Sequence, residues 1–294
     1  MSATLTRPTD AATPMPRPSK RRDLRRRRLV RFALLGVALL YVAVLLLLPL
    51  VGIVVTAFKG GASLIGHTFG DGQVRHAFLL TGIIALITVA VTTVLGITVA
   101  WVLVRQRFHG RAFLNALVDL PFALSPITVG LAAVLLFGRG GWFAPFFDAR
   151  GIQVLYALPG MVLVTIFISI PFTIREVQPV LEELGTDEED ASRTLGASVP
   201  QTFRKVTLPN IRWALFYGMA LSTARAIGEI GAVLLVSGVF QGRTQTATLL
   251  IYSLVENRQQ SEAYVVALTL ATVSILLLAG IEAAKHHMGK ERAR

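Results

Sequence analysis

The chain of 294 residues contains no cysteine, which excludes disulfide bonds, thiol nucleophiles and cysteine-ligated metal sites. Charged residues are also scarce. They make up 16% of the chain, whereas a soluble globular domain carries about a quarter. A G-x-x-x-x-G-K-[S/T] phosphate loop is absent, and the nearest fragment, Gly289-Lys290, is followed by Glu291. We therefore expect this chain not to be an ATPase.

The sequence also lacks the residue patterns that are typical of a metal site or of a hydrolytic active site. The five histidines show no metal-ligand spacing; they are His67, His76, His109, His286 and His287. Neither a carboxylate pair nor a nucleophile arrangement suggests hydrolysis. The sequence thus predicts no catalytic residue, no metal site and no directly bound cofactor.

Long apolar runs dominate what is present. The composition is 53% hydrophobic with a mean hydropathy of +0.63. A helix needs about 20 apolar residues to cross the hydrocarbon core of a bilayer. Six runs are near or above that length: 32–58, 78–104, 114–137, 153–174, 213–239 and 261–284. The sequence therefore predicts an all-α, polytopic membrane protein with six transmembrane helices and both termini on one side.

The distribution of Lys and Arg predicts which side that is. Ten lie in residues 1–31, three in 105–113, five in 175–212 and four in 285–294, against six in the loops of the other side. Cytoplasmic loops carry the excess of Lys and Arg in membrane proteins. Both termini are therefore expected inside the cell.

The N-terminal segment 1–30 is expected to be a disordered basic tail, because it is rich in Pro and Thr before the run KRRDLRRRRLVR. An RNA-binding arm is one interpretation of that run. We favour an anchor against anionic membrane lipid, where each basic side chain contributes about 1 kcal/mol, and expect no nucleic-acid partner. Residues 31–285 then form the membrane domain, and 286–294 a cytoplasmic C-terminal tail.

A polar module separates the fourth and fifth apolar runs, and it reads GTDEEDASRTLGASVPQTFRKVTLPN. Thr186 and Glu189 have the T-x-x-E spacing of a capping box, and Ser198 and Gln201 have the equivalent S-x-x-Q spacing. Gly196 lies between these two helix starts and suits a left-handed helix end. The pattern predicts two short helices joined by a glycine turn and followed by the next span.

This module resembles the EAA loop of permease subunits in bacterial ATP-binding-cassette (ABC) importers. Asp190, Ala191 and Ser192 stand at E-A-A, Gly196 at the glycine, and Leu208-Pro209 at the final L-P, at the family's spacing. The resemblance implies the type I importer permease fold and a coupling helix that docks on a cytoplasmic ATPase. Glu189 directly precedes the motif, so either Glu189 or Asp190 is a candidate for the ATPase contact.

Two further stretches, LVDLPFALSPITVGLAAVLLFGRGGW and ARAIGEIGAVLLVSG, resemble sulfate/thiosulfate importer permeases, particularly the W-type subunit. The resemblance implies a multi-pass subunit of the bacterial cytoplasmic membrane that pairs with a second, paralogous permease. It also implies two ATP-binding cassette subunits, which use ATP and Mg²⁺, and a periplasmic or lipid-anchored sulfate-binding protein.

Two places within the spans are candidates for the translocation path or its gate. Arg225 and Glu229 lie within the fifth span, where charge is costly and commonly marks a pathway or an internal pair. A self-neutralising i,i+4 pair and an anion-facing Arg225 both remain open. Ser125 and Pro126 interrupt the third span, and either a plain proline kink or a broken helix lining a cavity would explain them.

Other functions compete with sulfate import. Molybdate or tungstate permeases share the ARxxGExGA type of signature. A secondary transporter driven by an ion gradient would need intramembrane acids, and Glu229 is the one acid deep in a span. Transport by the chain without an ATPase would distinguish that class.

Overall fold

The computed structural model describes residues 20–59 and 61–290, and every regular element among them is a helix. The chain divides into two compact units, Met1–Gly52 and Ile53–Arg294. The first contains α1 (Lys20–Val42), a π-helical turn (Ala43–Leu47) and the start of α2 (Leu48–Lys59).

The stretch Val30–Lys59 is long and apolar enough to cross a membrane, in agreement with the span predicted at 32–58. Helix α1 begins at Lys20, inside the segment predicted to be a tail. Residues 1–19 of that segment, and 291–294 of the predicted C-terminal tail, lie outside the described residues.

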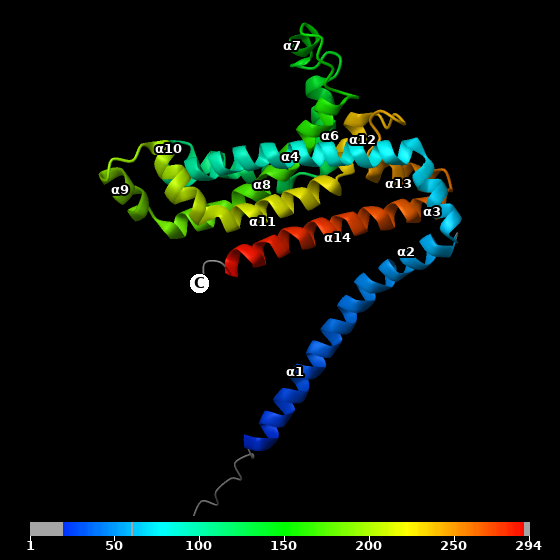
Figure 1. The fold of residues 1–294 in the computed structure, drawn as a ribbon, viewed down its shortest axis with the longest axis horizontal. Helices are drawn as coiled ribbons and strands as arrows, with labels where there is room; N and C mark the ends of the chain where they lie inside the picture. The colour runs from blue at the N-terminus through cyan, green and yellow to red at the C-terminus, as the bar shows by residue number, and fades with distance from the viewer. Residues whose placement is uncertain (1–19, 60, 291–294) are drawn as a thin grey trace, which may run out of the picture. The chain divides into compact units, whose positions relative to one another are not determined.

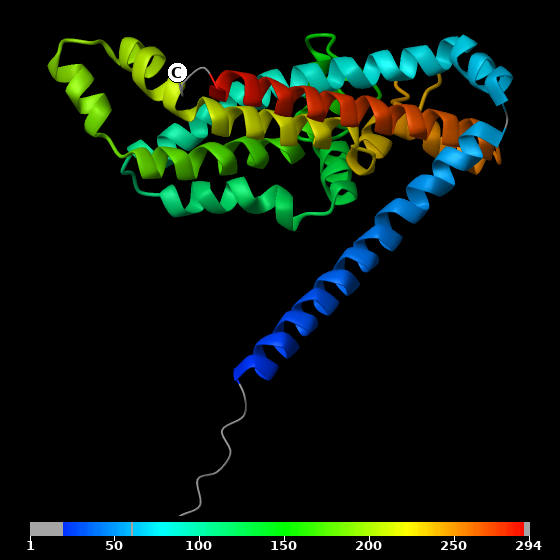
Figure 2. The same ribbon diagram turned by 60° about the horizontal axis from the view of Figure 1, so that its bottom comes forward.

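Four long helices run side by side in the second unit, as Figures 1 and 2 show: α4 (Gly72–Arg105), α8 (Leu158–Leu184), α11 (Leu208–Ile227) and α14 (Gln260–Lys290). Helix α4 packs against α8 and α11, and α14 packs against α11. Two shorter helices, α3 (Gly61–Gly70) and α13 (Ala247–Glu256), complete this bundle.

Two of the predicted spans are broken helices. The run predicted at 114–137 forms α5 (Arg111–Ala123) and α6 (Pro126–Phe137), with a bend of 111° between the two helices. The run predicted at 213–239 forms α11 and α12 (Gly231–Ser237), with a bend of 54° between the two helices. The described residues thus hold four continuous helices able to span a membrane, and up to six spans when each bent pair counts as one. Helix α6 and the short α7 (Ala144–Asp148) project from the side of the bundle (Figure 1).

Close backbone contacts join the three central helices at Thr173. A Cβ atom added at Gly96 of α4 would lie 2.6 Å from Thr173 Cγ2, and one added at Gly218 of α11 would lie 2.8 Å from Thr173 Cα. Thr173 Oγ1 also lies 3.1 Å from Ser222 Oγ of α11. Small residues allow such close packing in membranes, where apolar burial does not drive helices together. This contact separates two apolar core clusters, one around Met161 and one around Leu181.

Candidate functional site

The polar module folds as an elbow, by which we mean residues 185–207, at one end of the bundle (Figure 2). It contains α9 (Asp187–Thr194), α10 (Val199–Thr202) and a π-helical turn, η2 (Phe203–Thr207), that runs into α11. Gly196 has a φ of +86°, and its N–H donates to Arg193 O at 2.9 Å. The predicted pattern of two short helices joined by a left-handed glycine is confirmed.

One of the two predicted capping boxes forms. At the start of α10, Ser198 N donates to Gln201 Oε1 at 2.9 Å, as the S-x-x-Q spacing predicted. The predicted box of Thr186 and Glu189 is wrong, because Thr186 makes no side-chain cap. The Glu189 carboxylate points into the protein instead, where stronger, charged donors bind it.

Glu189 is held by Arg105 at the C-terminal end of α4. Arg105 Nε donates to Glu189 Oε2 at 3.1 Å, and Arg105 Nη2 donates to Glu189 Oε1 at 3.2 Å. Thr207 Oγ1 donates to the same Oε1 at 2.9 Å. The side chains of Arg105 and Glu189 are only 8% and 7% exposed. Removing one partner of such a buried pair costs about 3–5 kcal/mol.

Asp190 faces the opposite way. Its side chain is 60% exposed and lies 3.7 Å from Arg193 Nη1. Next to Gly196, the apolar side chain of Leu195 is also exposed, at 89%. The outer face of the elbow therefore offers a carboxylate and an apolar side chain to another molecule, while Glu189 is turned away from that face.

The remaining residues predicted in the motif occupy ordinary positions. Ala191 is exposed, and the half-buried Ser192 has its Oγ 3.2 Å from Thr202 Oγ1, which ties α9 to α10. Leu208 packs against the apolar cluster around Leu181, and Pro209 lies in the first turn of α11.

The second candidate site lies at the break between α11 and α12. Arg225 Nη2 is 2.7 Å from Glu229 Oε2, and the Glu229 side chain is 1% exposed against 28% for Arg225. Ala232 N donates to Glu229 Oε1 at 2.9 Å, and Thr248 Oγ1 donates to Glu229 O at 2.8 Å. The pair is therefore present, but Glu229 lies beyond the end of α11 and closes the break rather than bridging one continuous helix.

The structure brings the two helix breaks together. A Cβ atom added at Gly231 would lie 2.9 Å from Pro126 Cβ, and one added at Gly130 would lie 2.7 Å from Ala232 O. The start of α6 is thus pressed against the start of α12. Ser125 is exposed and its side chain makes no cap. Ser125–Pro126 and Arg225–Glu229 form one region, separate from the elbow (Figure 1).

Arg105 and Thr207 are functional candidates that sequence reasoning missed. A basic residue that ends an apolar run is ordinarily solvated, and Arg105 is separated from Glu189 by 84 positions. The available signal was the adjacent acidic pair Glu189 and Asp190. If one of the two carboxylates faces outward, the other faces the protein and needs a basic partner there. Among the described residues, no group of three His, Asp or Glu side chains could hold a metal ion.

Comparison with known proteins agrees with this geometry. Residues 92–284 match the family "Binding-protein-dependent transport system inner membrane component". The sulfate transport system permease protein CysW of Synechocystis sp. is 44% identical over 248 residues, covering 84% of this chain and 90% of that protein. CysT of Salmonella typhimurium is 38% identical over 245 residues, covering 83% and 88%.

A solved structure shares the fold. The crystal structure of a bacterial ABC transporter involved in the import of the acidic polysaccharide alginate superposes with a TM-score of 0.73 at 17% identity, covering 90% of this chain and 98% of that one. At this identity the likeness concerns the fold alone. The chain therefore belongs to the family of binding-protein-dependent transport system inner membrane components, and it is a multi-pass membrane protein.

Proposed function

We propose that this chain is the W-type permease subunit of a bacterial ABC importer that carries sulfate or thiosulfate across the cytoplasmic membrane. The observation that carries the proposal is the elbow, whose inner side is fixed by Arg105 and Glu189 while Asp190 and Leu195 face outward. A capped, braced segment transmits displacement, whereas a loose loop absorbs it. The relatives named sulfate permeases support the choice of cargo.

The proposed assembly has four kinds of subunit. Relatives of both the CysW and the CysT kind support a heterodimer with a second permease. Two ATP-binding cassette subunits dock on the elbows from the cytoplasm, where both termini also lie. A sulfate-binding protein delivers the anion from the other side. A related structure contains a periplasmic protein bound to alginate pentasaccharide, which supports such a partner.

The proposed mechanism is alternating access. Closure of the ATPase dimer displaces the elbow, and the displacement moves α8 and α11, which the elbow joins. The breaks at Ser125–Pro126 and at Glu229 lie on the translocation path, where Arg225 lowers the barrier to an oxyanion. ATP and the binding protein supply the difference in free energy between the two states, since a ligand shifts an equilibrium only by its preference for one state.

The test is sulfate uptake by a strain that lacks this chain and is complemented with variants. Gly196→Pro should lower uptake by about tenfold or more, because proline fixes φ near −65° and removes the N–H that donates to Arg193 O. ATP hydrolysis by the isolated complex should persist. Competition by molybdate at equal concentration should be weak.

Gly151→Pro is the matched control. Gly151 also has a positive φ, +66°, and donates its N–H to the residue three positions earlier, Asp148 O at 3.0 Å. It lies in the loop after α7, far from the elbow in sequence. Equal losses of coupling in both variants, or normal uptake with Gly196→Pro, would refute the role of the elbow. Stronger uptake of molybdate than of sulfate would refute the cargo.

A further inference from the structure

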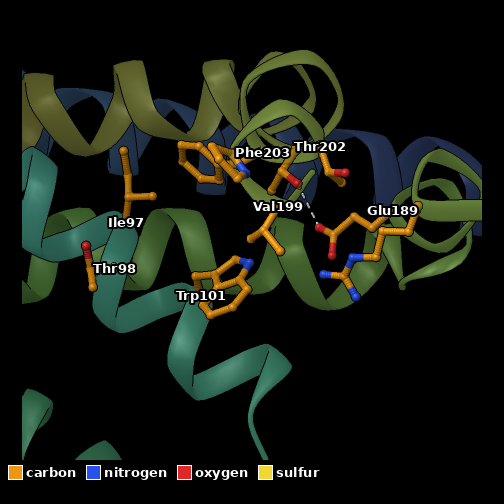
Figure 3. A pocket seen from close by; sticks show the side chains of 10 residues that line it. Ile97, Thr98, Trp101, Glu189, Val199, Thr202 and Phe203 are labelled. Carbon is orange, nitrogen blue, oxygen red and sulfur yellow. Dashed lines mark hydrogen bonds between the residues drawn. The ribbon is translucent and has the colours of Figure 1, made fainter. Parts of the chain in front are cut away.

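The elbow has few attachments to the bundle apart from the chain itself. It leaves α8 through Gly185, whose φ of +60° breaks the helix, and it enters α11 through η2. A cavity of about 320 Å³ separates part of it from α4, as Figure 3 shows. Ile97 and Trp101 of α4 lie on one side of this cavity, with Val199 and Phe203 of the elbow on the other (Figure 3). Apolar packing between the elbow and α4 is therefore incomplete.

We propose that Arg105 and Glu189 act as positioning residues that convert movement of the elbow into movement of α4. We call this pair, with its shared hydrogen bonds, the Arg105–Glu189 brace. The inference rests on the proposed coupling to an ATPase. Without the brace, the elbow would pivot at Gly185 and η2, and α4 would not follow it.

The contacts of the brace suit this task, because they join four segments at one point. The Arg105 guanidinium, at the end of α4, binds the Glu189 carboxylate of α9 through two nitrogens. Its third nitrogen, Nη1, donates to Leu181 O of α8 at 3.0 Å. The carboxylate also accepts from Thr207 of η2. A fork of parallel, charge-assisted hydrogen bonds fixes an angle as well as a distance.

Glu188 provides the contrast within the same helix. Its Oε2 accepts from Asn210 Nδ2 of α11 at 2.6 Å, and this contact is exposed to solvent. An exposed contact contributes little, and it does not reach α4. Of the two neighbouring glutamates, Glu189 alone ties α9 to α4 within the described residues.

The experiment compares Glu189→Gln with the matched control Glu188→Gln in the complete complex, reconstituted with its ATPase subunits and sulfate-binding protein. Glutamine keeps the shape of the glutamate side chain, but it replaces one accepting carboxylate oxygen with an NH₂ group that faces a donor. We expect about tenfold fewer sulfate ions transported per ATP hydrolysed, as the loss of a charge-assisted hydrogen bond predicts. Glu188→Gln should retain the ratio of the unaltered complex.

A second measurement separates positioning from simple damage. Because the chain has no cysteine, spin labels can be attached after Arg107→Cys and Thr194→Cys, at exposed positions beyond α4 and at the end of α9. We expect one narrow distance distribution with and without ATP, which broadens with Glu189→Gln. Thr207→Val, which removes one hydrogen bond and no charge, should change the ratio and the distribution in the same direction but less.

The outcomes are distinct. An unchanged ratio and an unchanged distribution for Glu189→Gln would overturn the brace. If Glu189→Gln prevents assembly, Thr207→Val decides the question by the same two measurements. Failure of the unaltered complex to transport sulfate with ATP would instead refute the proposed function on which the brace depends.

Discussion

At the scale of single residues, Glu189 and Asp190 show what spacing can and cannot predict. The motif placed both acids in the elbow, and the positions of Gly196, Ser198 and Gln201 were sufficient to predict the glycine turn and the second capping box. Which acid faces inward depends on Arg105, which lies 84 positions away and contacts Glu189 only in the folded chain. Local sequence therefore predicted the segment, and long-range contacts decided the role of each side chain.

Arg225 allows a prediction at the same scale. With Arg225→Ala, the carboxylate of Glu229, 1% exposed, loses the cation beside it. We expect a loss of about 3–5 kcal/mol in stability, measured as thermal unfolding of the purified protein in detergent.

The double variant Arg225→Ala with Glu229→Gln serves as the control. It removes the unpaired charge, and the amide oxygen can still accept from Ala232 N, so stability should largely recover. Sulfate uptake should remain low in the double variant if Arg225 faces the anion. Full stability of the single variant would show that the pair is not needed to neutralise Glu229.

At the scale of helices, Pro126 correctly predicted an interruption of the third span, but the angle of the bend was not predictable. The 111° bend between α5 and α6 accompanies the packing of Gly130 and Pro126 against α12. That contact joins segments about a hundred residues apart. Helix α13 was likewise not predicted, because its ten residues are too few to register as a span.

The contact at Thr173 gives a prediction about helix packing. Gly96→Ala places a methyl group 2.6 Å from Thr173 Cγ2, so we expect a loss of about 1–3 kcal/mol from overpacking. Gly82→Ala, in the same helix, meets no atom within 4 Å and should be neutral or stabilising by up to about 1 kcal/mol, because alanine favours the helix. Thermal unfolding of both variants checks this, and equal stabilities would contradict the close packing of α4 on α8.

At the scale of the whole molecule, the composition and the lengths of the apolar runs were sufficient to predict an all-helical membrane protein. The predicted number of spans agrees with four continuous helices and two bent pairs. Hydrophobic content could not reveal that two spans are broken, since each run is apolar on both sides of its break. The orientation with both termini inside remains a prediction from the distribution of Lys and Arg.

The central claim is that this chain moves its cargo only when an ATPase drives the elbow. The direct measurement is sulfate accumulation in proteoliposomes that contain the complete complex, with the sulfate-binding protein outside and ATP at the ATPase side. We predict accumulation that requires hydrolysable ATP, and none when a proton or sodium gradient replaces it. Accumulation driven by an ion gradient, with the ATPase subunits left out, would contradict the account.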